Sequence, residues 1–399
     1  ENTAMEEPFK RMRELLPDAV KFRREMHRYP ELSFMESETT ARIRRELEAT
    51  EGIEVLPPLL KTGIIAHIRG KYAGHVIMLR EDIDALPMHE NTGLEFSSEV
   101  SDACHSCGHD IHTASLLLFA KTAAMLRERM EGELLLVFQP AEETAAGAKS
   151  LLTAGFADKI PCPQEIIGFH VEPSLPAGKI GLIKGPANAS TDEIRIAVCG
   201  EGGHGAHPYR CADPITTAGY LLTQLQTIIS RENPAVEPAV LTFGMIQGGS
   251  APNIIPTRVE MVGTLRAFHE EGRHRMWDAI TRVSNLGAQA LRSWAEVGIR
   301  EGIPPLINDP FVADRLASAA DAVLGHDSVI WADQPSPGSD DFSCFLKLAP
   351  GVQFRMGTAN SDPRSALGLH NPKNIFDESA IYNAAAVMLQ YVLSGGTSQ

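Results

Sequence analysis

The first half of the chain alternates between short apolar runs and segments of helical spacing. The short β-rich runs occupy residues 63–68, 75–79, 133–138 and 165–169. Helical spacing occupies residues 37–49, 113–126 and 146–152. A further helix is expected over 8–26, interrupted or restarted at Pro17. Alternating strands and helices predict an α/β fold, with a mostly parallel sheet covered by helices on both faces.

The pattern changes near Gly185, where residues 185–190 have the composition of a linker. Strand, helix, strand, strand, helix and strand then follow in that order, at 193–199, 214–230, 239–247, 258–268, 273–294 and 297–303. This is the order of a split βαβ unit. The chain then returns to helical and loop segments, at 311–324, 341–347 and 378–393. We therefore expect one domain formed by residues 1–187 and 305–399, with residues 188–304 inserted as a smaller α+β domain.

Composition narrows the classes of protein that fit this pattern. The 399 residues are 43% hydrophobic and 22% charged, which is ordinary for a globular protein with room for two domains. A formal net charge of −15 argues against a nucleic-acid binder. No apolar run approaches the ~20 residues of a membrane span, and Glu1–Lys10 lacks the apolar core of a signal peptide. Six scattered cysteines suggest reduced thiols, so we expect a cytoplasmic protein without membrane or nucleic-acid partners.

One stretch, Cys104-His105-Ser106-Cys107-Gly108-His109-Asp110-Ile111-His112, concentrates side chains that bind transition metals. Such ions prefer thiolate and imidazole donors, and the apolar helix that follows would hold those donors at its N-terminus. The same residues are also compatible with half of a zinc knuckle, a thioredoxin-like redox pair or a polar loop without function. The other cysteines form no second pair, and a c-type haem motif would need histidine where Gly108 stands.

Polar side chains directly follow three of the predicted strands, namely Asp82 and Asp84, then Glu142 and Glu143, then His170. His370 lies in a loop rich in Gly and Pro nearer the C-terminus. Taken singly, each has a plain structural explanation as a helix start, a core histidine or a loop residue. Because open α/β sheets bind ligands at the carboxyl ends of their strands, their joint occurrence there favours a functional site.

Five of these candidates can serve together as metal ligands, namely Cys107, His109, Glu143, His170 and His370. Five donors support two ions that share a bridging water, whereas a structural zinc ion takes four. Such a site needs a carboxylate outside the ligand set to accept the proton of that water. Consecutive residues point in different directions, so Glu143 can bind metal while Glu142 serves as the general base.

Eight motifs along the chain occur in the order of one known family. They are Arg80-x-Asp82-x-Asp84-Ala85-Leu86-Pro87, Cys107-Gly108-His109-Asp110, Pro140-Ala141-Glu142-Glu143, His170, Gly202-Gly203-His204, Asn253-Ile254-Ile255-Pro256, Gly338-Ser339-Asp340-Asp341-Phe342 and Leu369-His370-Asn371. From Arg24 to about Glu378, the chain resembles the aminoacylase, hippurate hydrolase and indole-acetyl-amino-acid hydrolase group of di-metal amidohydrolases. That group is related to carboxypeptidases that carry an inserted "satellite" domain.

The resemblance implies an enzyme that splits N-acetyl, N-benzoyl or similar N-acyl amino acids into a carboxylic acid and a free amino acid. It implies that the five donors bind two divalent ions (Mn²⁺, Zn²⁺, Co²⁺ or Ni²⁺) and that Glu142 is the general base. Asp84 and Asp110 would support the ligands from behind and orient them.

The resemblance also assigns roles to the satellite domain. His204 would stabilise the oxyanion, Asn253 and Arg266 would help bind the substrate carboxylate, and the domain would close over the site and form a homodimer. The sequence departs from the family at Tyr209, where histidine is usual, and at Asp340, where glutamate is usual. These departures bear on which acyl group and which amino acid fit.

Three alternative functions remain open from the sequence. An exopeptidase or dipeptidase on the same scaffold would use the same metal ligands. A non-catalytic homologue would bind amino-acid conjugates or metal without turnover. A redox protein would use Cys104 and Cys107 as its dithiol pair.

Overall fold

The computed structural model describes residues 2–395, and describes side chains from residue 6 onward. The chain divides into two compact units. The first unit comprises Glu1–Gly185, Asn308–Gln334 and Asp341–Gln399, and the second comprises Pro186–Ile307 and Pro335–Asp340. Residues 335–340 join the second unit because Ala189 N donates hydrogen bonds to the carbonyl oxygens of Ser336 and Gly338.

The first unit is built on an eight-stranded sheet with the strand order β1-β2-β4-β3-β5-β16-β6-β15. The strands are β1 (Glu54–Val55), β2 (Ile64–Arg69), β3 (Tyr72–Asp82), β4 (Glu131–Gln139), β5 (Glu165–Pro176), β6 (Ile180–Leu182), β15 (Val329–Trp331) and β16 (Gly351–Ala359). The central strands β4, β3, β5 and β16 are parallel, while antiparallel pairs occur toward both edges. The predicted α/β fold with a mostly parallel sheet is confirmed.

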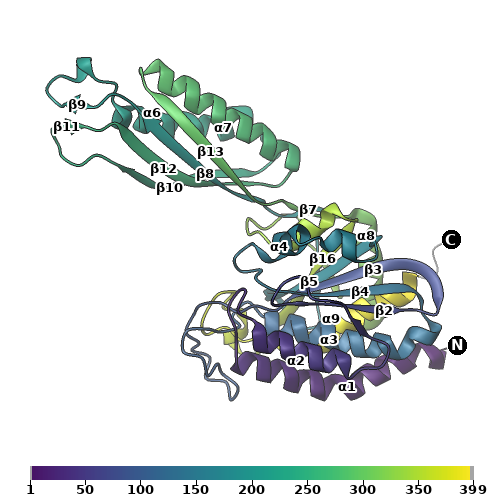
Figure 1. The fold of residues 1–399 in the computed structure, drawn as a ribbon. Coiled ribbons are helices and arrows are strands. Elements are labelled where there is room, and N and C mark those ends of the chain that lie inside the picture. The colour runs from purple at the N-terminus through teal and green to yellow at the C-terminus, as the bar shows by residue number, and fades with distance from the viewer. Residues whose placement is uncertain (1, 396–399) are drawn as a thin grey trace. The chain divides into compact units, whose positions relative to one another are not determined.

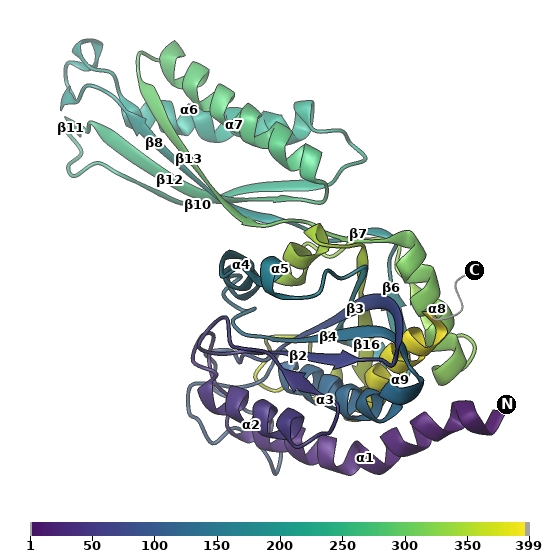
Figure 2. The same ribbon diagram turned by 45° about the vertical axis from the view of Figure 1, so that its right-hand side comes forward.

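Helices cover both faces of this sheet (Figures 1 and 2). On one face, α3 (His109–Leu126) and α9 (Ser379–Ser394) pack on the strands, and α1 (Asn2–Arg28) packs on these two helices. The remaining helices are α2 (Ser37–Glu48), α4 (Gly147–Thr153), α5 (Phe156–Lys159) and α8 (Pro310–Leu324), with the 3₁₀ segments η1 (Arg127–Arg129), η4 (Asp341–Lys347) and η5 (Pro363–Ala366). Because α3 lies between the sheet and two other helices, it is apolar on nearly every side and forms the centre of the core.

The second unit has the predicted order of a split βαβ fold. Its elements are β8 (Thr191–Cys199), α6 (Pro214–Thr227), β10 (Ala239–Gly248), β12 (Arg258–Ala267), α7 (Glu270–Ala290) and β13 (Trp294–Ile303). The four strands form an antiparallel sheet in the order β10-β12-β8-β13, with α6 and α7 on one face (Figure 2). Smaller elements are β9 (Gly203–His204), η2 (Pro208–Arg210), η3 (Ile228–Glu232) and β11 (Ile254–Ile255).

Three predictions about individual elements were wrong. Helix α1 runs through Pro17 without a break, because its packing on α3 and α9 compensates for the missing backbone hydrogen bond. The helix predicted over 273–294 ends at Ala290, because Arg292 takes a left-handed φ of 64° and Trp294 begins β13. The linker expected at 185–190 contains a short strand, β7 (Gly185–Asn188), which pairs with β14 (Leu306–Asn308).

Strand β16 was not predicted at all, although it lies in the middle of the large sheet. Within the described residues, no helix is both long and apolar enough to cross a membrane.

Candidate metal centre

The five predicted metal ligands all belong to the first unit and come from four separate segments. Cys107 and His109 lie at the start of α3, Glu143 in the loop after β4, His170 on β5, and His370 in the loop after η5. The segments meet at the end of the sheet where β3 and β4 finish. This is the edge where parallel sheets place their ligand sites.

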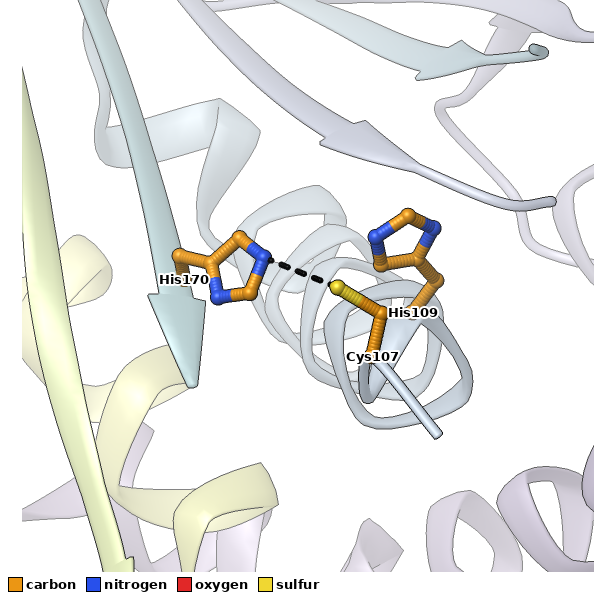
Figure 3. A group of neighbouring side chains, drawn as sticks. All are labelled: Cys107, His109 and His170. Carbon is orange, nitrogen blue, oxygen red and sulfur yellow. Dashed lines mark hydrogen bonds between the residues drawn. The ribbon is translucent and has the colours of Figure 1, made fainter. Parts of the chain in front are cut away.

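The start of α3 approaches β5 closely because residue 108 is glycine. Gly108 has a φ of 82°, and a Cβ atom there would lie 2.4 Å from Cγ2 of Val171. This close approach brings Cys107 Sγ to 3.5 Å from His170 Nε2. Figure 3 shows the thiol of Cys107 and the ring of His170 facing each other, with His109 beside them on α3.

His170 lies inside a strand rather than at its end, which corrects the sequence prediction. The pairing of β5 with β3 stops at Ile167, whereas its pairing with β16 continues to Pro176. Beyond Ile167, β5 therefore has no strand on its β3 side, and the start of α3 occupies that side instead. His170 Nδ1 donates to the carbonyl oxygen of Val171 at 2.8 Å, so Nε2 is the ring nitrogen that faces Cys107.

The Glu143 carboxylate lies between two histidines. Its Oε1 is 3.7 Å from His109 Nε2, and its Oε2 is 3.5 Å from His370 Nε2. His109 Nε2 and Glu143 Oε1 are buried and have no hydrogen-bond partner among the described residues. These distances exceed a hydrogen bond and suit two donors that share one ion at about 2.0–2.2 Å each. The donor atoms therefore fit a transition metal.

Three overlapping groups of donor atoms each lie within 4.8 Å, namely Cys107 with His109 and His170, Cys107 with Glu143 and His370, and His109 with Glu142 and Glu143. Cys107, His109 and Glu143 each belong to two of these groups, so the three groups are continuous with one another. Burial raises the pKa of Cys107 well above its usual range. Burial disfavours a charged ring at His109, yet the nearby Asp82 and Cys107 raise its pKa well above the usual value. Both shifts favour the protonated side chain, so we expect metal binding to release protons.

Asp84 supports two of the proposed ligands from behind. His109 Nδ1 donates to the Asp84 backbone oxygen at 2.9 Å and lies 3.2 Å from Oδ1, which leaves Nε2 for the metal. The other carboxylate oxygen accepts from Ser33 Oγ at 2.7 Å and from Glu143 N at 3.0 Å. Burial by itself raises the pKa of Asp84, but the hydrogen bond and charge of His109 lower it below its usual range.

Asp110 faces the opposite direction and fastens α3 to α1. It is fully buried, and its Oδ2 lies 2.6 Å from Arg23 Nε and 2.8 Å from His27 Nδ1. These positive partners hold the pKa of Asp110 far below its usual range against the effect of burial. Asp110 thus anchors the turn that presents the neighbouring His109.

His204, Asn253 and Arg266 lie on the second unit. His204 on β9 pairs with Ile254 of β11, and Gly205 N donates to the Asn253 carbonyl oxygen at 2.8 Å, so His204 and Asn253 are neighbours. Arg266 lies on β12 and donates from Nη1 to the Pro337 carbonyl oxygen at 3.0 Å.

Residues outside the five proposed ligands support the cluster, and of these the sequence alone did not single out Ser33 and Glu36. His112 uses both ring nitrogens, donating from Nδ1 to Asp82 Oδ1 at 2.6 Å and accepting at Nε2 from Val171 N at 3.0 Å. From the turn before α2, Glu36 reaches the loop around Glu143, whereas Ser33 reaches Asp84, which in turn accepts from Glu143 N. Ser33 and Glu36 are ordinary polar residues of a turn, so no sequence signal marks them as part of the site.

Comparison with known proteins places this geometry in context. The model of peptidase family M20/M25/M40 matches residues 78–394. The chain is 40% identical over 368 residues to N-acetylcysteine deacetylase of Bacillus subtilis (strain 168), which covers 91% of this chain and 92% of that protein. It is 34% identical over 374 residues to thermostable carboxypeptidase 1 of Saccharolobus solfataricus, with 93% of each chain covered.

Among solved structures, a Bacillus subtilis dinuclear metal binding peptidase from the M20 family aligns with a TM-score of 0.84. That alignment has 36% sequence identity and covers 97% of this chain and 100% of the other. These matches confirm the resemblance inferred from the motifs. Together with the groups of donor atoms that could hold a metal ion, they support the binding of two divalent metal ions by this chain.

Proposed function

This chain belongs to peptidase family M20/M25/M40, and from that premise we propose how it works as a metal-dependent amidohydrolase of N-acyl amino acids. The reaction splits the amide bond into a carboxylic acid and a free amino acid. The observation that carries the proposal is the five-donor cluster with Glu142 directly beside it. The relative named as an N-acetylcysteine deacetylase supports the substrate class.

The proposed ligands are Cys107, His109, Glu143, His170 and His370. Two divalent ions held by them would polarise the amide carbonyl and make water a better nucleophile. Thiolate and imidazole donors favour Zn²⁺, Co²⁺ or Ni²⁺ over the hard ions Mg²⁺ and Ca²⁺. Mn²⁺ is included because the family resemblance implies it.

Glu142 acts as the proton carrier in this proposal. Its carboxylate accepts the proton of the attacking water and delivers that proton to the leaving nitrogen. Its carbonyl oxygen accepts from Ala145 N at 2.7 Å, which keeps the loop after β4 tightly turned. Asp84 and Asp110 keep the histidine and carboxylate ligands oriented while the proton moves.

His204 suits the role of oxyanion donor. Its Nδ1 accepts a hydrogen bond from Ala206 N at 3.0 Å, so the ring proton resides on Nε2. A neutral imidazole with an outward N–H stabilises developing negative charge on the carbonyl oxygen. Asn253, its neighbour, and Arg266 are proposed to bind the substrate carboxylate, for which a guanidinium is the best-shaped donor.

We further propose that the second unit, whose satellite role is inferred from the resemblance, forms a homodimer through β10. This strand lies at the edge of its sheet, and Met245 and Ile246 on it are each 51% exposed. An exposed apolar edge strand favours pairing with a second copy. Sedimentation should show a dimer that Ile246→Lys converts to monomer. Met125→Lys, at a side chain 54% exposed on the first unit, is the matched control and should leave the dimer intact.

A cytoplasmic location is also proposed. All six cysteines are free thiols, which a reducing compartment preserves. The net charge of −15 supports small-molecule substrates rather than nucleic acid as the binding partner.

The test of function is release of free amino groups from N-acetyl, N-benzoyl and longer N-acyl amino acids, with Mn²⁺ or with a chelator. Chelator-sensitive release is expected from at least one of these compounds. Glu142→Gln should lower kcat by about 10²–10⁴-fold while two metal ions remain bound. Glu128→Gln, on the exposed segment η1, is the control and should retain wild-type activity. Full turnover by Glu142→Gln would contradict the assigned role.

A second candidate function is exopeptidase activity, because a relative of 34% identity is named a thermostable carboxypeptidase. Both reactions use the same metal centre and the same proton carrier. Including dipeptides in the substrate panel separates them, since an exopeptidase would release amino acids from dipeptides and leave the N-acyl amino acids intact.

A further inference from the structure

Glu36 is a fully buried carboxylate that the metal centre does not explain. It precedes the first residue of α2, where a side-chain oxygen often accepts hydrogen bonds from the first helical amides. Glu31 performs that task instead, accepting from Glu38 N at 3.1 Å and from Thr39 N at 2.7 Å. Glu36 makes no capping bond to its own helix, so its carboxylate is directed elsewhere.

The carboxylate of Glu36 reaches the loop that carries the two glutamates of the centre. Its Oε1 accepts a hydrogen bond from Ala141 N at 2.8 Å. Ala141 is itself fully buried and has a φ of 56°, in the left-handed region that alanine rarely adopts. A buried amide without an acceptor is costly, so the bond to Glu36 stabilises Ala141 in a conformation that it would otherwise leave.

The same turn also contacts the other side of the glutamate pair. Ser33 Oγ donates to Asp84 Oδ2, and that oxygen accepts from Glu143 N. Ser33 and Glu36 therefore bracket Glu142. Glu36 holds the residue before it, and Ser33 holds the residue after it through Asp84.

We propose that Glu36 is a positioning residue, whose contact with Ala141 sets the direction in which Glu142 and Glu143 leave the loop. This inference rests on the proposed roles of those two glutamates. The side chains of Glu142 and Glu143 must point in opposite directions for the proposed reaction, because one faces the substrate while the other faces the metal. A loop that relaxed at Ala141 would rotate both side chains together.

The role depends on the reach of the side chain rather than on its charge. Burial raises the pKa of Glu36 above its usual value, and the Thr62 hydroxyl faces the carboxyl group. A glutamine at this position keeps an acceptor oxygen at the same distance. An aspartate keeps the charge, but it is one carbon–carbon bond of about 1.5 Å shorter.

Two variants test whether the reach of the Glu36 side chain or its charge is the important property. Glu36→Gln should retain kcat within about threefold, because the bond to Ala141 N is preserved. Glu36→Asp should lower kcat about 30–100-fold with KM within about twofold, because a misplacement of about 1 Å costs roughly that much. Glu31→Ala is the control. It removes the cap of α2 and should lower the melting temperature without lowering kcat.

A second readout does not depend on turnover. Metal-free protein is titrated with Co²⁺ and followed by the thiolate-to-cobalt absorption that Cys107 would produce. Wild type and Glu36→Gln should bind two ions, whereas Glu36→Asp should bind at least one of them about tenfold more weakly because Glu143 is displaced. Circular dichroism confirms that each variant is folded.

Two results would overturn the proposal. One is a Glu36→Asp protein that equals wild type in both kcat and Co²⁺ affinity. The other is a Glu36→Gln protein that loses as much as Glu36→Asp, which would make charge the important property. If wild type hydrolysed no N-acyl amino acid, the proposed function would fail, and the Co²⁺ titration would still decide the role of Glu36.

Discussion

Replacing Asp84 by asparagine tests whether one carboxylate orients two metal ligands at once. Oδ1 of Asp84 lies 3.2 Å from His109 Nδ1, and Oδ2 accepts from Glu143 N at 3.0 Å. Asparagine has one acceptor oxygen, so its NH₂ group must face one of these two donors. If the NH₂ group faces His109, it donates to Nδ1 and favours the His109 tautomer with its proton on Nε2, the nitrogen proposed to bind metal. Facing the loop, it leaves the amide of Glu143 without an acceptor.

The expected loss of metal affinity depends on which contacts of residue 84 remain in Asp84→Asn. The backbone oxygen of Asp84 still accepts from His109 Nδ1 at 2.9 Å, so the site is weakened rather than lost. One hydrogen bond to a charged group is worth about 1.5–3 kcal/mol. We therefore expect metal affinity to fall about 10–100-fold, as for other partners that orient metal ligands.

The assay is titration of metal-free protein with Zn²⁺ in competition with a fluorescent chelator, at constant pH. Asp102→Asn is the matched control, because Asp102 is exposed and close in sequence to the same motif. It should bind two ions with wild-type affinity. An Asp84→Asn protein that also did so would refute the reasoning that Asp84 fixes the orientation of His109 and Glu143.

Three further predictions concern protons, stability and the glutamate loop. Burial raises the pKa of Cys107, and the nearby Asp82 outweighs burial to raise the pKa of His109, so metal competes with protons for both side chains; metal affinity should fall as pH is lowered, and binding in weak buffer should release protons. Binding without proton release would contradict those shifts. Asp192→Ala removes the buried partner that lies 2.6 Å from Arg273 and leaves it with more exposed partners such as Glu270 at 3.1 Å, so it should destabilise the second unit by about 3 kcal/mol, seen by calorimetry as an earlier transition. Gly147→Ala places a Cβ 1.7 Å from a backbone oxygen and should abolish hydrolysis, so wild-type kcat would show that the loop can adapt.

The arrangement of helices and strands could largely be predicted from the sequence. One central strand, β16, was not predicted, and the reason is physical. Periodicity identified the strands that flank α3, because their residues are apolar in unbroken runs. Strand β16, at Gly351–Ala359, includes Gln353 and Arg355 and has no such run. It lies between β5 and β6, and these neighbours bury it, so only tertiary structure reveals it as a strand.

The sequence by itself determined the chemistry of the centre. Thiolate, imidazole and carboxylate are properties of single residues, and their order along the chain was enough to predict two metal ions and to propose a proton carrier. Tertiary structure alone decided how these groups face one another. Gly108 allows α3 to approach β5, and Glu36 holds Ala141 from more than a hundred residues away. Such contacts depend on how distant segments pack, and no local pattern of residues encodes that packing.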